Sequence, residues 1–96
     1  MRLRYEFMIM EMEKGEYSAV VVGEDANKFH GMLKLNEVSA VIMEQLKEET
    51  DLYKIHNVLK EKYPESTDDE IGKALAGFVT ILGRSGLLID EAAGLL

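Results

Sequence analysis

The stretch of sequence that decides the fold is the one in which a short strand leads into a helix, Gly31-Met32-Leu33-Lys34-Leu35-Asn36-Glu37-Val38-Ser39-Ala40-Val41-Ile42. The segment from Met32 to Leu35 is long enough for a short strand. Asn36 is placed to cap the following helix, because its side chain can accept a hydrogen bond from the first helical amides. The apolar residues of that helix recur at three- and four-residue spacings and form one stripe for a core: Val38, Val41, Ile42 and Leu46.

Upstream of this stretch the sequence predicts a β-hairpin. From Tyr5 to Met12 the side chains alternate, with Tyr5, Phe7 and Ile9 on one face and three methionines on the other. Glu13-Lys14-Gly15-Glu16 supplies a turn with glycine where a positive φ is needed. The β-branched segment Tyr17 to Gly23 is then the second strand. Glu24 to Gly31 has the composition of a loop, and a helical turn through Ala26 and Phe29 is the alternative.

Downstream of it the sequence predicts two more helices. The first begins at Thr50 or Asp51 and ends at Pro64, because proline cannot continue a helix. Its apolar face is Leu52, Ile55, Leu59 and Tyr63. The second begins at Thr67-Asp68-Asp69-Glu70, which has the spacing of a capping box. Gly83 and Gly86 flank its end, and its apolar residues cover a broad arc: Ile71, Ala74, Leu75, Phe78, Ile81 and Leu82.

The element order is therefore a three-stranded antiparallel sheet followed by three helices, which is a segregated α+β domain. A chain of 96 residues is long enough to enclose one hydrophobic core. We expect one domain over residues 1–89 and a flexible C-terminal tail over residues 90–96.

Composition excludes several classes of function. Eleven Lys and Arg against eighteen Asp and Glu give a net charge of −7, so the averaged field repels polyanions and makes nucleic acid a poor ligand. The absence of cysteine excludes disulfides and thiolate catalysis and is compatible with a reducing compartment. Because no apolar run is long enough to span a bilayer and no signal peptide opens the chain, we expect a cytoplasmic protein that does not enter a membrane.

The sequence also lacks an arrangement of residues that would support catalysis. His30 and His56 are the only histidines, and neither has a metal-ligand or triad spacing. The paired carboxylates have the positions of helix ends and solvated faces, and the glycines are too isolated to cradle a phosphate. We therefore expect no catalytic residues, no metal site and no cofactor, and hence a protein that is not an enzyme.

One surface remains that could bind a ligand. The third strand is short and is a candidate sheet edge, and the last helix carries the small residues Ala74, Ala76 and Gly77, which would let another backbone approach. An edge strand offers unpaired N–H and C=O groups to an extended peptide, while neighbouring pockets select its side chains. The alternative is that these small residues serve only tight packing between helices.

The stretch from Gly31 to Ile42 resembles the strand-to-helix segment of the PqqD-like family, in which a leucine-asparagine pair is followed by a small residue and an aliphatic one. The resemblance continues to the end of the last helix and covers Tyr5 to Ile89. It implies a winged helix-turn-helix fold that serves as a peptide recognition element for ribosomally made, modified peptides. In that family the leader of a precursor peptide adds as a strand beside the third strand, against the third helix. The domain presents it to a modifying enzyme, often a radical S-adenosylmethionine (SAM) protein.

Carried onto this sequence, the resemblance implies two groups of peptide-binding residues. One is Met32, Leu33, Lys34 and Leu35, and the other is Lys73, Gly77, Ile81 and Arg84, which flank one edge of the buried arc at 100° per residue. The three cations could pair with acidic residues of a leader, although exposed pairs contribute little each.

Two positions differ from the pyrroloquinoline quinone (PQQ) members of the family. Phe29-His30-Gly31 stands where these often have Pro-Glu-Gly, and Met43 stands where related sequences have an aromatic residue. The resemblance therefore leaves the pathway open between PQQ biosynthesis and another modified peptide.

Met8, Met10 and Met12 share one strand face and have two interpretations. Flexible methionine side chains can fill a core, or they can form an adaptable surface for the modifying enzyme or for a second copy in a homodimer.

Two other functions stay open. A winged-helix DNA-binding regulator would need a basic recognition helix, but the last helix sets Lys73 and Arg84 against Asp68, Asp69 and Glu70. The second of these functions is a non-catalytic subunit of a larger enzyme that does not recognise a leader.

Overall fold

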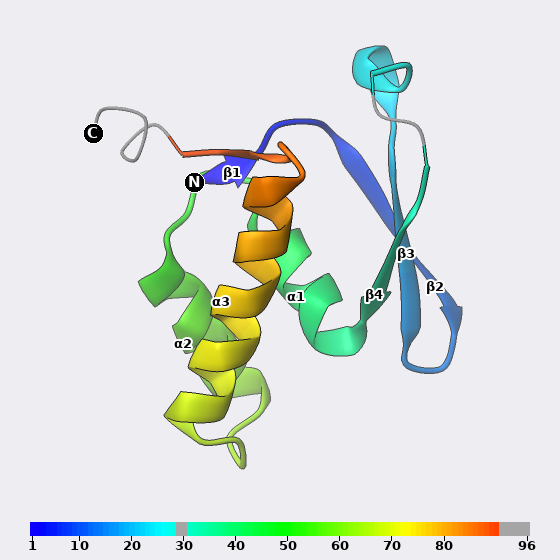
Figure 1. The fold of residues 1–96 in the computed structure, drawn as a ribbon. Helices are drawn as coiled ribbons and strands as arrows, with labels where there is room; N and C mark the ends of the chain where they lie inside the picture. The colour runs from blue at the N-terminus through cyan, green and yellow to red at the C-terminus, as the bar shows by residue number, and fades with distance from the viewer. Residues whose placement is uncertain (29–30, 91–96) are drawn as a thin grey trace.

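The computed structural model describes residues 1–28 and 31–90 (Figure 1). Within them the chain forms, in order, β1 (Arg2–Leu3), β2 (Phe7–Glu13), β3 (Glu16–Val21), the 3₁₀ turn η1 (Gly23–Asp25), β4 (Leu33–Asn36), α1 (Glu37–Gln45), α2 (Leu52–Lys62), α3 (Asp68–Arg84) and β5 (Leu88–Ile89). The predicted α+β arrangement, a three-stranded antiparallel sheet followed by three helices, is confirmed.

The main sheet has the strand order β2-β3-β4, and both of its ladders are antiparallel. The hairpin turns at Lys14 and Gly15, where Gly15 has the predicted positive φ of 80°. Tyr17 lies opposite Glu11 on one side and Leu35 on the other, so the register places the odd-numbered residues of the three strands on one face as far as Glu11 in β2. Beyond Glu11 the register shifts, and Glu13 lies opposite Glu16.

Side-chain caps begin the three α-helices where the sequence predicts them. Asn36 accepts a hydrogen bond from the Ser39 amide at 2.8 Å, and Asp51, rather than Thr50, accepts one from the Lys54 amide at 2.8 Å. The capping box of α3 is complete, since Thr67 and Glu70 exchange hydrogen bonds of 3.1 and 2.9 Å. Hydrogen bonding of the Glu70 carboxyl to Thr67, first with its backbone amide and then with its side chain, lowers the pKa of that carboxyl.

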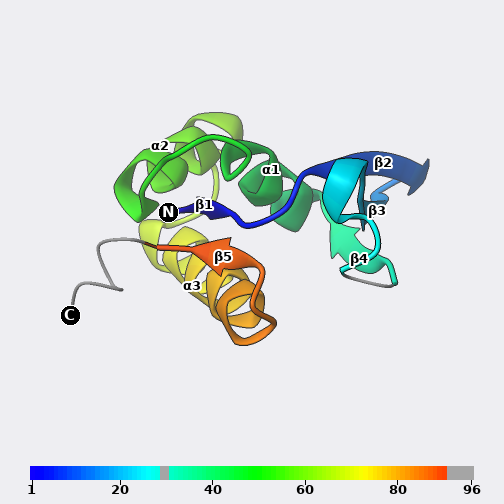
Figure 2. The same ribbon diagram turned by 90° about the horizontal axis from the view of Figure 1, so that it is seen from above.

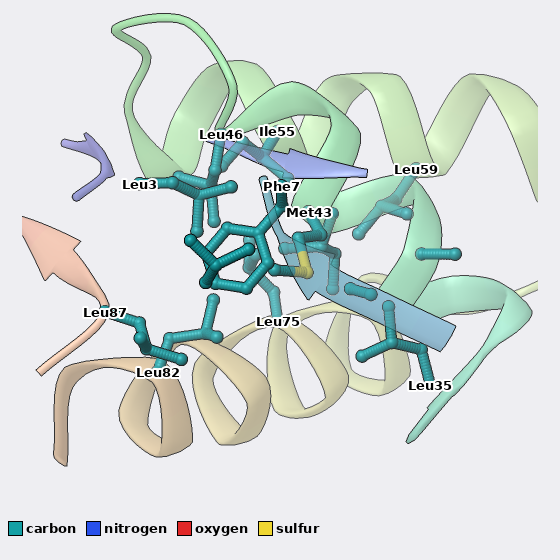
Figure 3. Close-up of a cluster of buried hydrophobic side chains, with 14 of the residues drawn as sticks. Leu3, Phe7, Leu35, Met43, Leu46, Ile55, Leu59, Leu75, Leu82 and Leu87 are labelled. Carbon is teal, nitrogen blue, oxygen red and sulfur yellow. The ribbon is translucent and has the colours of Figure 1, made fainter. Parts of the chain in front are cut away.

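The core lies between the odd-numbered face of the sheet and the three helices. In Figure 3 the ring of Phe7 points in among Met43, Leu75 and Leu82. The largest fully buried side chains come mostly from the helices and are Ile42, Met43, Leu46, Ile55, Leu59, Leu82 and Leu87. Helix α1 is central, because it contacts both the sheet and the other two helices.

A second, two-stranded sheet joins the two ends of the domain, and the sequence analysis missed it. β1 pairs with β5, with Arg2 opposite Ile89 and Leu3 opposite Leu88. The Leu3 amide also donates to the Leu46 carbonyl, and the Arg4 amide to the Leu87 carbonyl, both at 2.8 Å. Two-residue strands are too short to show an alternating pattern, so they cannot be predicted from the periodicity of the sequence.

The structure corrects the predicted apolar faces of α2 and α3. Leu52, at the first position of α2, is exposed rather than part of the core, and so are Ala74 and Ile81 on α3. The arc of α3 that is fully buried is narrower than predicted and consists of Ile71, Leu75 and Leu82. The predicted helical turn through Phe29, and the tail beyond Asp90, lie outside the described residues.

Candidate functional site

β4 forms one edge of the main sheet. Within the described sheet it has a neighbouring strand, β3, on one side only. In an antiparallel ladder alternate residues direct both their N–H and C=O groups to the same side, so every second residue of β4 presents these groups outward. The backbone of β4 therefore offers a place where another extended segment could pair.

The side chains of β4 divide between the two faces of the sheet. Leu35 is 7% exposed and belongs to the core, and Leu33 is half-buried on the same face. Lys34 and the preceding Met32 are exposed. Of the four predicted contact residues in this segment, Leu35 can thus offer only its main chain to a ligand, whereas the others also offer side chains.

The predicted contact residues on α3 lie along an exposed edge of that helix. The opposite edge faces α2, where Gly72 and Ala76 line a cavity together with Leu52, Tyr53 and His56. Ile81, which is 57% exposed, and Gly77 lie about 140° or more of helical rotation away from Gly72. The nominated residues of α3 are thus exposed to solvent instead of covered by α2.

Gly77 has no packing partner that would require glycine. A Cβ atom added to it would meet nothing within 4 Å. The interpretation that small residues on α3 serve only tight helix packing is therefore wrong for Gly77. It remains open for Ala76, which lines the cavity beside α2.

β4 and α3 lie on the same side of α1. Figure 2 shows both elements on that side, with α2 and β2 away from it. Leu33 on β4 and Phe78 on α3 are half-buried and pack against the core cluster, so each edge has apolar surface at its base. The two predicted groups of contact residues thus lie in and beside β4 and on α3, two elements on the same side of α1.

One side-chain contact fixes the junction between β4 and α1. The Tyr63 hydroxyl, at the end of α2, donates to the Glu37 carboxylate at 2.9 Å. Burial, followed by this bond to a carboxylate, raises the pKa of Tyr63 to about 12. Because Glu37 directly follows β4, the contact ties α2 to the point where the strand enters the helix.

The cations nominated for leader binding are all exposed. Lys73 already pairs with Asp69 one helical turn earlier, at 3.1 Å between Nζ and Oδ2. Arg84 is the last residue of α3, and Lys34 lies opposite Ser18 on the sheet. These charges can adjust to a ligand, since long exposed side chains are not held in one geometry.

The histidines and carboxylates form no catalytic arrangement among the described residues. No group of three or more potential ligands that could hold a metal ion occurs there. His56 is near Asp68, with 4.0 Å between Nε2 and Oδ1, and Lys60 is 3.8 Å from the same carboxylate. His30 lies outside the described residues. No helix in the described part of the chain is long and apolar enough to cross a membrane.

The outer face of the main sheet is a second surface of interest. Met8 and Met12 are 47% and 59% exposed and Met10 is half-buried, so the core-filling interpretation is wrong for Met8 and Met12. Met32 is exposed as well, and it lines a hollow together with Met12, Ser18 and Lys34. From the sequence, Met32 was predicted only as a residue of the third strand that contacts the leader. Because it lies two residues before Lys34, its side chain is on the same face of the sheet, and this spacing could have predicted its place on the outer face.

Comparison with known proteins identifies one family. The model of the family described as coenzyme PQQ synthesis protein D (PqqD) matches residues 6–88, which is nearly the whole chain. No curated protein and no solved structure gives a significant match.

Proposed function

The chain belongs to the coenzyme PQQ synthesis protein D family, and we propose from this premise that it binds the leader segment of a ribosomally made precursor peptide and presents it to a modifying enzyme. It acts without catalysis and without a cofactor of its own. The pathway is PQQ biosynthesis or that of a related modified peptide, and the enzyme is of the radical SAM type. As the sequence suggests, the proposal assigns the chain to the cytoplasm.

The leader adds as a fourth strand beside β4. The observation that carries this proposal is that β4 has an open edge and lies on the same side of α1 as α3, whose nominated contact residues are exposed. Main-chain groups of residues 32–35 pair with the leader backbone, which supplies affinity that depends little on sequence. Lys34, Lys73 and Arg84 lie where they can meet acidic leader residues.

α3 supplies the selective part of the site. Ile81 offers an apolar side chain that is 57% exposed, and Gly77 leaves room for the leader backbone or a bulky leader side chain. Contacts of this kind exclude water from the peptide hydrogen bonds, which strengthens them.

A titration followed by nuclear magnetic resonance tests the proposal. Isotope-labelled full chain is mixed with a synthetic peptide that has the leader sequence of a PQQ precursor peptide. We expect shifts concentrated in residues 32–35 and 73–84. Shifts confined to the cavity between α2 and α3, around Tyr53 and His56, would place the peptide elsewhere and contradict the proposal.

A matched pair of variants sharpens this test. Ile81 and Leu52 are both exposed aliphatic residues on helices, at 57% and 44% exposure. Ile81→Glu should weaken leader binding about tenfold or more, because it puts a charge in the apolar contact. Leu52→Glu should leave the affinity within about twofold of wild type. Equal effects of the two changes, measured by calorimetric titration, would rule out the assigned site.

One observation weighs against a DNA-binding function, and a co-purification experiment tests the other alternative. The first turn of α3 carries Asp68, Asp69 and Glu70, which would repel DNA phosphates from a recognition helix. We therefore expect no salt-dependent mobility shift with duplex DNA. For a subunit without leader recognition, the enzyme should co-purify equally with and without precursor peptide, whereas the proposal expects the precursor to enter the complex.

A further inference from the structure

The outer face of the main sheet carries an apolar surface made mostly of methionine. The register defines this face. Met8 lies opposite Val20, and Ser18 lies between Met10 on one neighbouring strand and Lys34 on the other. We call its apolar residues the methionine face: Met8, Met10, Met12, Val20 and Met32. Three of them, Met8, Met12 and Met32, are about half exposed or more, at 47%, 59% and 51%. An apolar patch of this kind on a small domain marks a surface where another molecule binds.

The methionine face reaches the edge where the leader would bind. Met32, which belongs to this face, directly precedes β4, and Lys34 in β4 lines the same hollow as Met12 and Met32. Side chains of a strand point alternately to the two faces of its sheet. A leader paired with β4 would therefore turn half of its side chains toward α3 and the core, and the other half outward beside Met32 and Lys34.

We propose that the modifying enzyme docks on the methionine face and contacts the outward side chains of the bound leader at the same time. This inference rests on the proposed function, because it assumes a leader beside β4. In this arrangement the two faces of the leader strand are recognised by two different proteins. This chain recognises the inward side chains, and the enzyme recognises the outward ones together with the methionines.

Charge favours an enzyme over a second copy of this chain as the occupant. The charged residues beside the methionine face include Glu13 and Glu16, which lie opposite each other, and Lys34, and the whole chain has a net charge of −7. Two copies placed face to face would bring like charges together, which opposes association. The complementary partner is a protein with an apolar surface bordered by Lys and Arg.

Methionine suits this role because its side chain is flexible and polarisable. It can repack against a partner surface whose shape changes when a leader is present or absent. Branched side chains such as Val or Ile would fill the same face with fewer available conformations. The face is thus fitted to bind the enzyme both with and without precursor peptide.

The six methionines of the chain provide a direct test. In full-length chain labelled at the methionine methyl groups, Met8, Met10, Met12 and Met32 report on the face. Met43, which is 0% exposed, and Met1, which lies off the main sheet, serve as internal controls. The probe is an unlabelled radical SAM enzyme of the PQQ pathway, added with and without leader. We expect the methyl signals of the four methionines on this face to shift or broaden, and the signals of the two control methionines to stay unchanged.

Variants separate this inference from the proposed function. The double change Met8→Glu and Met12→Glu should weaken enzyme binding about tenfold or more and leave leader affinity within about twofold. The control Tyr53→Glu alters a side chain that is 76% exposed on α2 and should leave both affinities unchanged. All three positions are exposed, so thermal unfolding should show that each variant remains folded.

The outcomes are distinct. If the leader binds but the double variant binds the enzyme as well as wild type does, the docking surface is wrong and the proposed function stands. If the leader does not bind wild-type chain, the proposed function itself fails. Concentration-dependent dimerisation, detected by sedimentation and accompanied by shifts of the same methyl groups without enzyme, would assign the face to a second copy and overturn the inference.

Discussion

Gly77 lies inside α3, a helix of 17 residues, where glycine lowers helix stability. Glycine inside a helix costs about 0.8–1.0 kcal/mol relative to alanine. No atom of this chain approaches the position where its Cβ would be, so internal packing does not require glycine here. In the proposed complex, a leader that passes close to α3 would account for the small residue.

The first residue-scale prediction is that Gly77→Ala makes the free chain more stable and a poorer binder. Unfolding in denaturant should show a gain of about 0.5–1 kcal/mol, while calorimetric titration should show weaker leader binding because the added methyl group occupies the approach path. Gly83→Ala is the matched control, since its Cβ also meets nothing and it lies on the side of α3 away from Ile81. Identical leader affinity in wild type and Gly77→Ala would show that Gly77 is not part of the site.

Single residues were also where the sequence was most informative. Asn36, Asp51 and Thr67 could be assigned as caps because a cap bonds to an amide two or three residues away, and the sequence contains both partners. The exposure of Leu52 and Ile81 could not be assigned in this way. Their periodicity fits a buried face, but which part of that face is covered depends on where the neighbouring elements lie.

At the scale of elements, β4 differs from β3 in having one open edge. β3 is paired on both sides and β4 on one only, within the described sheet. Hydrogen exchange should therefore be faster at every second amide of β4 than in β3, because those amides point away from the ladder.

The element-scale prediction is that leader binding slows exchange at these outward amides of β4. The amides of β3 should keep their rates, since their partners do not change, and they serve as the control. Slowing in β2, the opposite edge of the sheet, with β4 unaffected, would mean that the peptide adds to the other edge.

The elements that the sequence predicted are those long enough to carry a period. The α-helices and the hairpin show periods of 3.6 and 2 over several repeats, whereas β1 and β5 have two residues each and show none. Pairing of β1 with β5 joins residues more than eighty positions apart, which no local pattern records. The same limit applies to the candidate site. The sequence indicated the strand β4 and the helix α3, but only the structure shows that both lie on the same side of α1.

At the scale of the whole molecule, the β1–β5 sheet closes the domain around α1. Leu3 and Leu87 are 5% and 1% exposed and bring both ends of the described chain into the core. The shape is flat, with extents of 40 × 40 × 19 Å, so few layers of side chain cover the centre. Each buried leucine therefore carries a substantial share of the stability.

The whole-molecule prediction is that Leu3→Ala destabilises the fold by about 2–5 kcal/mol, because it removes buried methyl groups and leaves a cavity. Leu52→Ala, which shortens an exposed leucine, should change the free energy of unfolding by less than about 0.5 kcal/mol. Denaturant unfolding of the three proteins gives both values. Equal stability of Leu3→Ala and wild type would mean that β1 does not contribute to the core.

The central claim is that a leader peptide pairs with β4 and rests on α3. The most direct measurement is a set of intermolecular nuclear Overhauser effects between isotope-labelled chain and unlabelled leader. The account predicts backbone-to-backbone contacts between the leader and residues 32–35, and side-chain contacts from the leader to Ile81. Contacts only to β2, or only to the cavity between α2 and α3, would contradict it.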